Sequence, residues 1–243
     1  MSLAEYRRLI RPLLPEHLPA NALEVYFAFH HPDHKTSLST YPPPSVAAGV
    51  QGYVAVSQTG MDLFRPLVTL RLPLDDMSAC LDLLYGALRP ETAVFLSAPE
   101  THFPLINALF DIQVEDHLHL YVLAPERFTP VINLLVTRTT TANGLPRFVI
   151  RTADNQIAAS AQLNWQSPRF AELAVYTAAG QRRQGLGRSV VAALAQHVWE
   201  NGRTPLYAVM ADNPSSRQLA ESVGFVDTLA RTFMIQGQLR PRP

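Results

Sequence analysis

The segment QRRQGLGR, residues 181–188, constrains the fold of this chain more than any other. It follows the apolar run 170–180 and precedes the helix-like run 189–202, so it predicts a strand that enters a helix through a glycine-containing loop. Glycine lets backbone N–H groups turn inward and approach an anion closely. The first helical turn adds unpaired N–H donors and the positive end of the helix dipole. Together with its arginines, this segment predicts a phosphate site, and we expect the ligand to be a pyrophosphate.

Two other phosphate-binding loops do not fit these residues. A dinucleotide-binding loop needs a third glycine three positions after Gly187, and the chain has Val190 there. A Walker loop needs Gly-Lys followed by Ser or Thr, which the loop lacks. The alternative to phosphate binding is that the arginines of this loop are simply solvated, since charged runs usually face water. The position between a strand and a helix favours contact with phosphate.

Composition narrows the class of partner and compartment. The chain of 243 residues has a formal net charge of +0, whereas nucleic acid and anionic membranes select a basic surplus. Cys80 is the single cysteine, so an intrachain disulfide is excluded and a reducing compartment fits. Neither an apolar signal core nor a run of ~18 apolar residues occurs. We therefore expect a soluble cytoplasmic protein, monomeric or homodimeric, with neither nucleic acid nor membrane as its partner.

The first half of the chain alternates between strand-like and helix-like segments, which predicts an α/β layer with part of its sheet parallel. The polar, proline-rich segment 30–45 is predicted to be a loop. The expected elements are a helix at 3–14, strands at 49–57 and 67–72, a helix at 74–88, a strand at 93–96, a helix at 101–110 and a strand at 118–123.

The second half is predicted to begin with a hairpin formed by residues 148–151 and 157–165. After the glycine loop and its helix we expect a strand at 206–210 and a helix at 214–223. Gly224 is the expected end of that helix, followed by a last strand.

The two halves share a layout. Residues 93–112 and 206–225 both read as a strand, a short turn, a helix and an apolar exit, so a repeated topology is expected. The halves differ in the connection before that unit, which in the first half has no glycine and contains Asp75 and Asp76. These acids would repel phosphate, so only the second half should bind it. We expect an N-terminal α/β domain over 1–128 and a C-terminal domain over 129–243.

The second half resembles a known family. Arg182, Gly185 and Gly187, preceded by the run ELAVYT, resemble the acyl-CoA-binding motif of the GNAT acyltransferase superfamily. The segment ADNPSSRQLAESVGF at 211–225 is similar to the strand-end asparagine, helix and Gly-Phe exit that follow in that family. The resemblance implies a mixed α+β fold, with a mixed sheet flanked by helices and splayed open around the loop. Acyl-CoA would lie in the opening, and the first half would be a second α/β domain, a candidate degenerate copy of the same fold.

The resemblance also implies which residues hold the donor. Strand backbone groups would contact the pantetheine arm, the loop would hold the pyrophosphate, and Asn213 would line the far side. The residues expected to bind acetyl-CoA are Val175, Tyr176, Thr177, Arg182, Arg183, Gln184, Gly185, Leu186, Gly187, Arg188, Asn213 and Ser216. No metal is expected.

Catalysis in this family requires a proton acceptor for the amine and a proton donor for the thiolate. Glu172 is the expected base, and a surface glutamate on an alternating strand is the alternative. The family commonly has a tyrosine seven positions after the strand-end asparagine, where this chain has Ala220. Tyr176, Tyr207, Ser222 or a water could replace it. Tyr176 joins Glu172 as our candidate catalytic pair.

The histidine clusters suggest structural roles. His30, His31 and His34 lie in the polar segment without further spaced ligands, so solvated side chains are expected rather than a metal site. His117 and His119 share one face of a predicted strand, which favours a half-exposed strand face over an acceptor cleft.

The sequence therefore predicts an N-acetyltransferase that moves an acetyl group from acetyl-CoA to a primary amine by direct attack. The acceptor would be a small-molecule amine, a protein N-terminus or a lysine. The alternative, motivated by Ala220, is an acyl-CoA-binding sensor or scaffold without catalysis.

Overall fold

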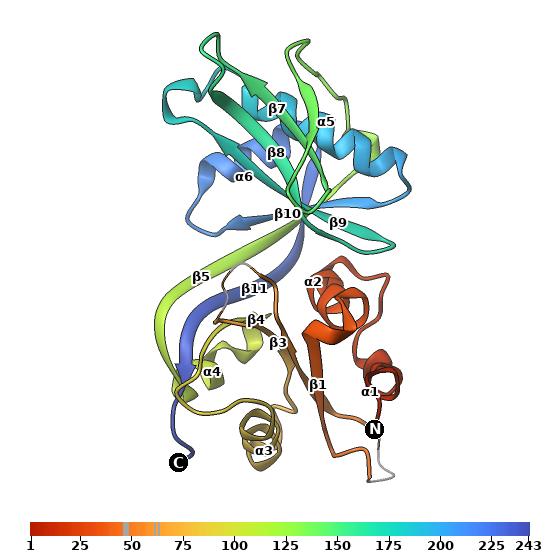
Figure 1. Cartoon of the computed structure of the whole chain (residues 1–243), viewed down its shortest axis with the longest axis vertical. Helices are drawn as coiled ribbons and strands as arrows, with labels where there is room; N and C mark the ends of the chain where they lie inside the picture. The colour runs from red at the N-terminus through yellow and green to blue at the C-terminus, as the bar shows by residue number, and fades with distance from the viewer. Residues whose placement is uncertain (46–48, 61, 63) are drawn as a thin grey trace. The chain divides into compact units, whose positions relative to one another are not determined.

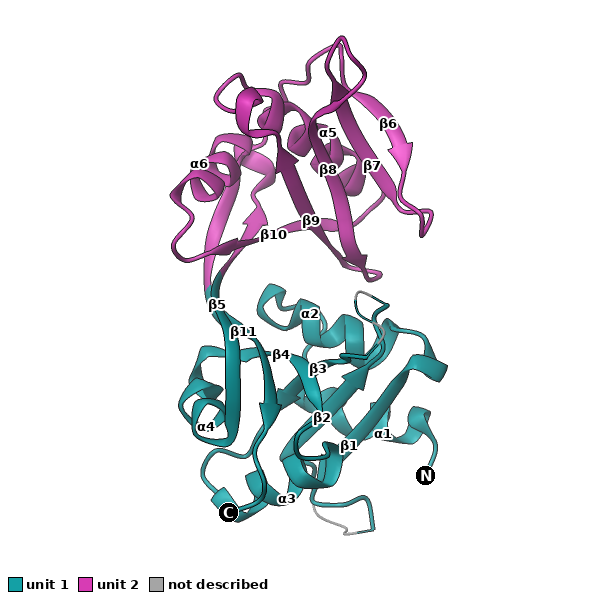
Figure 2. Ribbon diagram, turned by 60° about the vertical axis from the view of Figure 1, so that its left-hand side comes forward, with its two compact units in different colours: residues 1–118, 230–243 teal, residues 119–229 magenta. Residues whose placement is uncertain are grey.

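The computed structural model describes residues 1–45, 49–60, 62 and 64–243. The chain divides into two compact units (Figure 2): Met1–Leu118 with Ala230–Pro243, and His119–Leu229. Each is built from strands and helices, as predicted. The division differs from the expected boundary at residue 128, because the end of the chain returns to the first unit and the second begins at His119.

The first unit contains an antiparallel run of strands followed by a parallel crossover. Its elements (Figure 1) are α1 (Leu3–Ile10), α2 (Ala22–Val25), a π-helical turn (Tyr26–His30), β1 (Thr36–Tyr41), β2 (Gly52–Ser57), β3 (Leu67–Arg71), α3 (Met77–Ala87), β4 (Ala93–Pro99), α4 (Phe103–Leu109) and the start of β5 (Phe110–Leu123). One apolar core joins β3 and β4 to α3, and another lies between α1, α2 and strands β1 and β2.

The predicted loop at 30–45 was wrong over part of its length. Residues Thr36–Tyr41 form β1, which pairs antiparallel with β2 from Thr36 opposite Ser57 to Tyr41 opposite Gly52. Leu38 and Thr40 are buried while their neighbours are not, and Leu38 joins an apolar core. One apolar side chain was too weak a signal to reveal this alternation in the sequence.

The elements of the second unit are the end of β5, β6 (Thr137–Thr140), β7 (Pro146–Arg151), β8 (Ile157–Gln166), β9 (Phe170–Thr177), α5 (Leu186–Glu200), β10 (Thr204–Met210), α6 (Pro214–Val223) and the start of β11 (Phe225–Leu239). From β7 onward, the second unit has the same succession of elements as the first unit has from β1 onward. Strands β6 to β9 are antiparallel neighbours, and β10 is parallel to β9. The predicted hairpin and the helix ending at Gly224 are confirmed.

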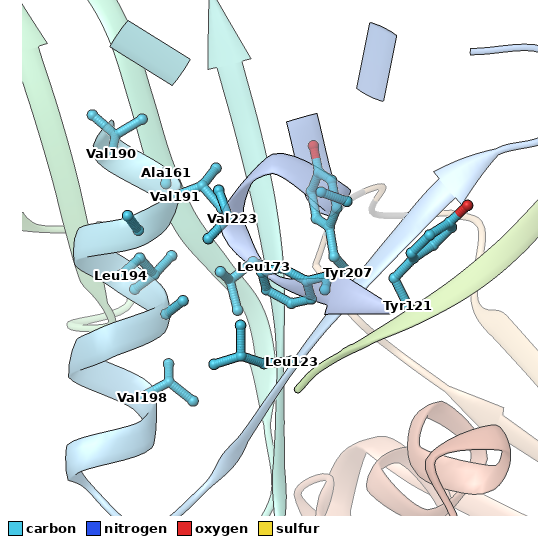
Figure 3. Close-up of a cluster of buried hydrophobic side chains, with 14 of the residues drawn as sticks. Tyr121, Leu123, Ala161, Leu173, Val190, Val191, Leu194, Val198, Tyr207 and Val223 are labelled. Atoms are coloured by element: carbon cyan, nitrogen blue, oxygen red, sulfur yellow. The ribbon is translucent and has the colours of Figure 1, made fainter. Parts of the chain in front are cut away.

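The core of the second unit lies between α5 and the sheet (Figure 3). Val190, Val191 and Leu194 of α5 pack in one cluster with Leu173 of β9 and Tyr207 of β10. Burying each such side chain contributes roughly 1.5–3 kcal/mol. This packing fixes the start of α5 against the two parallel strands, where the glycine loop lies.

Each unit's sheet is completed by a strand from the other half of the chain. In the first unit β11 lies between β4 and β5, and Thr232–Gln238 of β11 pair antiparallel with β4. In the second unit β5 lies between β10 and β11. Gly237 permits the close approach in the first unit, since a Cβ there would lie 2.7 Å from the carbonyl oxygen of Asp111. The exchange explains why β5 extends well beyond the strand predicted at 118–123.

Candidate functional site

The site begins where two parallel strands separate. Strands β9 and β10 are paired from Phe170 opposite Thr204 to Glu172 opposite Leu206. Beyond that pair β9 continues to Thr177 and β10 to Met210. A cavity of about 920 Å³ opens between these strand ends, the glycine loop and α6. Diverging strands leave backbone donors and acceptors facing the opening, which suits an amide-bearing ligand.

The wall of the cavity combines polar and apolar residues from β8, β9, β10, the glycine loop, α5 and α6. Its lining residues are Asn164, Glu172, Leu173, Ala174, Val175, Thr177, Gln181, Arg182, Arg183, Gly185, Leu186, Gly187, Arg188, Tyr207, Ala208, Met210, Asn213, Ser215, Ser216, Gln218, Leu219 and Ser222.

The loop has the backbone geometry of an anion cradle. Arg183 has φ 60° and Gly185 has φ 76°, so both adopt the left-handed backbone conformation. Residues in this conformation turn neighbouring backbone N–H groups toward one side of the loop. Gly185 is the N-cap of α5 and provides no side-chain hydrogen bond to the helix, which leaves the first-turn N–H groups available to a ligand. Gly187 lies so close to β9 that a Cβ would be 2.8 Å from Thr177 Oγ1. The residues present therefore fit a pyrophosphate at a helix N-terminus.

Most of the residues predicted to bind the donor are brought together by the fold. The cavity wall includes Val175, Thr177, Arg182, Arg183, Gly185, Leu186, Gly187, Arg188, Asn213 and Ser216. Asn213 has a further structural role as the N-cap of α6, where its Oδ1 accepts a hydrogen bond of 3.0 Å from the Ser216 N–H.

Two predicted residues do not line this cavity. Tyr176 is 57% exposed and is absent from the wall, although it was a candidate both for catalysis and for donor binding. Gln184 is exposed, and its Nε2 donates to the Gly180 carbonyl oxygen at 3.4 Å. Tyr176 shares its strand face with Glu172 and Ala174, which do line the cavity, so strand alternation does not explain its position.

Glu172 lies at the last pair before the strands diverge, and it lines the cavity. Its Oε1 accepts a 2.7 Å hydrogen bond from Asn164 Nδ2, and its Oε2 accepts one of 3.2 Å from Trp165 Nε1. Burial raises the pKa of Glu172 above the usual value, and these two donors oppose the rise. A carboxylate with a raised pKa accepts protons well near neutral pH.

Tyr207 lies one position beyond the last pair on β10 and also lines the cavity. Its side chain is buried, and its hydroxyl lies 3.0 Å from Ser216 Oγ of α6. Burial raises the pKa of this phenol, so Tyr207 keeps its proton at neutral pH. The position where a tyrosine was sought holds Ala220, which is fully buried in the core.

Glu172 and Tyr207 face the opening from opposite sides of the sheet. Paired residues of parallel strands share a face, so Glu172 shares the face of Leu206, and Tyr207 points to the other face. The side chain of Tyr207 belongs to the core beneath α5, which confirms its direction. Glu172 and Tyr207 therefore reach the cavity wall from opposite faces of the sheet.

The sequence interpretation missed several wall residues. Asn164, Met210 and Gln218 line the cavity but have no motif of their own. Asn164 occupies a β-bulge in β8, because the pairing with β9 shifts between Leu163 and Trp165. No turn residue or glycine marks this bulge in the sequence, so its position could not have been read there.

The histidines have the structural roles expected, with one correction. His31 is buried rather than solvated, and its Nδ1 lies 2.8 Å from Thr36 Oγ1. His117 bridges the carboxylates of Glu100 and Glu115. Among the described residues, no cluster of His, Cys, Asp and Glu is suited to hold a metal ion. Within the same part of the chain, no helix is long and apolar enough to cross a membrane.

Comparison with known proteins agrees with this geometry. The family model described as "FR47-like protein" matches residues 165–234, which include β9, the glycine loop, α5, β10 and α6. No curated protein matches the chain.

Solved structures match nearly the whole length. The chain is similar to a GCN5-related N-acetyltransferase from Sphaerobacter thermophilus, with 10% identity, a TM-score of 0.60 and coverage of 100% of this chain and 95% of that one. It is similar to a GCN5-related N-acetyltransferase-like protein from Streptococcus suis, with 15% identity, a TM-score of 0.58 and coverage of 97% and 100%. A tandem GNAT protein from the clavulanic acid biosynthesis pathway matches with 12% identity, a TM-score of 0.60 and coverage of 100% and 96%.

The fold and the strand opening define the class: the chain has the fold of the GNAT superfamily. Its two units, each with a parallel crossover followed by a second helix, fit the tandem arrangement of the last relative.

Proposed function

We propose that this protein is an N-acetyltransferase that moves an acetyl group from acetyl-CoA to a primary amine. The observation that carries the proposal is the cavity between β9 and β10, whose wall includes the glycine loop, Glu172 and Tyr207. The choice of an acetyl donor is supported by the names of structural relatives that are N-acetyltransferases. The proposed acceptor is a small-molecule amine, a protein N-terminus or a lysine.

Donor binding is assigned to the loop and the separated part of β9. The backbone N–H groups from Arg183 to Arg188 would bind the pyrophosphate, with arginine side chains adding charge. Backbone groups of Val175 and Thr177 would pair with the pantetheine amides as a neighbouring strand would. The thioester would then lie near the point where the strands diverge, between Glu172 and Tyr207.

The reaction needs a proton acceptor for the ammonium and a proton donor for the thiolate. Glu172 accepts a proton from the incoming ammonium, either directly or through water, and so frees its lone pair to attack the thioester carbonyl. The tetrahedral intermediate collapses by breaking the C–S bond. The departing thiolate takes the proton of the Tyr207 hydroxyl, while Ser216 steadies the phenol through their 3.0 Å contact. The proton that the attacking nitrogen loses as the amide forms returns to the Tyr207 phenolate. Tyr207 thus takes the role that Ala220 cannot perform.

A sensor or scaffold that binds acyl-CoA without transfer is the second candidate, since Ala220 replaces the usual tyrosine. The decisive experiment pairs calorimetric binding of acetyl-CoA with CoA-thiol release over a panel of primary amines. Binding with thiol release that depends on the amine supports the acetyltransferase. Tight binding without release for any amine supports the sensor, and lack of binding overturns both.

A further inference from the structure

The bulge in β8 places two hydrogen-bond donors on one carboxylate. Leu163 pairs with Leu173 and Trp165 pairs with Glu172, so Asn164 is an extra residue in β8. A bulge of this kind changes the direction of the side chains around it. Here it lets consecutive residues, Asn164 and Trp165, both reach Glu172. In a regular strand, consecutive side chains would point to opposite faces.

Each oxygen of the Glu172 carboxylate accepts one of these two hydrogen bonds. Asn164 Nδ2 lies 2.7 Å from Oε1, and Trp165 Nε1 lies 3.2 Å from Oε2. An indole N–H can only donate, so Oε2 must accept, and the amide of Asn164 satisfies Oε1 in the same way. This arrangement fixes the rotation of the carboxyl plane and favours its ionised form.

Few groups other than Asn164 and Trp165 affect the protonation of Glu172. On β10 its register partner is the apolar Leu206. Among the residues that the structure describes, burial raises the pKa of Glu172, and Asn164 and Trp165 lower it. No charged neighbour is among the causes of that shift. The protonation state of Glu172 therefore depends on the balance between burial and two uncharged donors.

We propose that Asn164 and Trp165 are positioning residues that hold Glu172 as a carboxylate directed into the cavity, and so set its capacity to take a proton from the acceptor amine. This inference rests on the proposed function for its catalytic consequence. The orientation and ionisation of Glu172 are properties of the protein itself and can be measured without turnover.

The kinetic test compares Asn164→Ala and Trp165→Phe with the wild-type protein over a range of pH. Asn164 is exposed, so its truncation should leave the fold intact. Trp165→Phe keeps a buried aromatic ring and removes the N–H. Because a lost donor disfavours the carboxylate, the acid limb of the kcat/KM profile should move to higher pH. We expect a loss on the order of tenfold on the acid limb and less than twofold on the alkaline plateau.

Gln166→Ala is the matched control, because Gln166 lies on the same strand and pairs with Ala171 rather than with Glu172. It should leave the pH profile and the affinity for acetyl-CoA unchanged. Asn164→Ala should also keep that affinity within twofold. An equal loss of kcat/KM at every pH would indicate a merely structural role and would overturn the proposal.

The independent readout is the titration of the Glu172 carboxyl by NMR in protein labelled with ¹³C at glutamate Cδ. The signal is assigned by its absence from Glu172→Gln. We expect its midpoint to rise in Asn164→Ala and in Trp165→Phe, and to stay in place in Gln166→Ala. Unchanged midpoints in both donor variants would refute the positioning role. A raised midpoint in a protein that acetylates no amine would uphold the positioning role while the proposed function fails.

Discussion

Each unit contains two parallel strands connected by a helix. The units differ in what the backbone N–H and C=O groups beyond the paired residues face. Strands β3 and β4 pair from Leu67 opposite Phe95 to Thr69 opposite Ser97, and α3 connects them. Strands β9 and β10 also pair over a short stretch, and α5 connects them. In the first unit the side chain of His102 accepts a hydrogen bond from one such group, the Leu72 N–H. In the second unit those groups face a cavity.

His102 fills the position beyond the pairing in the first unit. Its Nε2 accepts a hydrogen bond of 3.0 Å from the backbone N–H of Leu72, directly after β3. Burial lowers the pKa of His102 to about 4, so the ring is neutral and can accept. The corresponding stretch of β9, from Leu173 to Thr177, lines the cavity instead.

The helix N-termini differ in the same way. Asp76 is the N-cap of α3, and its Oδ1 accepts a 3.0 Å hydrogen bond from the Ala79 N–H. This carboxylate neutralises the positive end of α3 with a charge from the chain itself. The N-cap of α5 is Gly185, which has no side chain to do so. A helix start without an internal anion can accept one from a ligand.

The largest expected effect comes from transferring the aspartate N-cap of α3 to α5. Gly185→Asp places a carboxylate where the pyrophosphate should bind, and aspartate tolerates a φ of 76° better than most side chains. The affinity for acetyl-CoA should fall on the order of 100-fold in calorimetry. Gly180→Asp is the control, because a Cβ at Gly180 meets no atom within 4 Å and Gly180 is not a wall residue. Equal losses in the two variants would refute a specific cradle.

Removing the proposed base should separate chemistry from binding. Glu172→Gln should lower kcat on the order of 100-fold and leave acetyl-CoA affinity within twofold. A base must be deprotonated to act, and burial raises the pKa of Glu172. The acid limb of the wild-type profile should therefore lie above the usual glutamate range and disappear in the variant. A wild-type profile in Glu172→Gln would remove this residue from the mechanism.

Removing the His102 side chain should destabilise the first unit without affecting donor binding. His102→Ala leaves the buried Leu72 N–H without its acceptor and should cost roughly 2 kcal/mol of unfolding free energy in urea. The exposed His34→Ala should change it by less than about 0.5 kcal/mol. If His102→Ala were as stable as His34→Ala, the hydrogen bond to Leu72 would contribute nothing.

The same histidine predicts a pH dependence of stability. Its folded pKa of about 4 lies below the ordinary histidine value of 6.5, so the unfolded chain binds more protons between these values. The stabilising contribution is complete above about pH 6.5 and is lost as the pH falls to about 4. The change in the free energy of unfolding with pH over this range should be smaller in His102→Ala than in the wild type.

The smallest expected effect concerns the proposed proton donor. Tyr207→Phe keeps the buried ring and removes the hydroxyl, and kcat should fall roughly tenfold because a thiolate is already a good leaving group. Tyr176→Phe is the matched control, since Tyr176 is exposed and does not line the cavity. A greater loss in Tyr176→Phe than in Tyr207→Phe would reverse the assignment.

Local features of the site were predictable from the sequence. The Gln181–Arg188 loop combines glycines, arginines and a helix start within one short segment, so each signal reinforced the next. The end of α6 at Gly224 followed from the left-handed conformation that glycine allows, and its φ is 107°. Of the acids before α3, Asp76 caps that helix, and the exclusion of phosphate from the first half stays a prediction.

Features that depend on tertiary structure were not predictable. The exchange of β5 and β11 between the units involves pairings distant in sequence, such as Thr232 with Pro99. The bulge at Asn164 arises from a register shift that leaves no mark in composition. The exposure of the Tyr176 side chain was not predictable either, and its role in donor binding and catalysis stays a prediction.

The central claim is that the second unit binds acyl-CoA at its strand opening, whereas in the first unit His102 and Asp76 of the chain itself bind the corresponding N–H groups. Isothermal titration of the whole protein with acetyl-CoA tests this most directly through the stoichiometry. We predict one binding site per chain, and the same titration of Gly185→Asp should show strongly weakened binding. Two sites per chain, or one site of unchanged affinity in Gly185→Asp, would contradict the account.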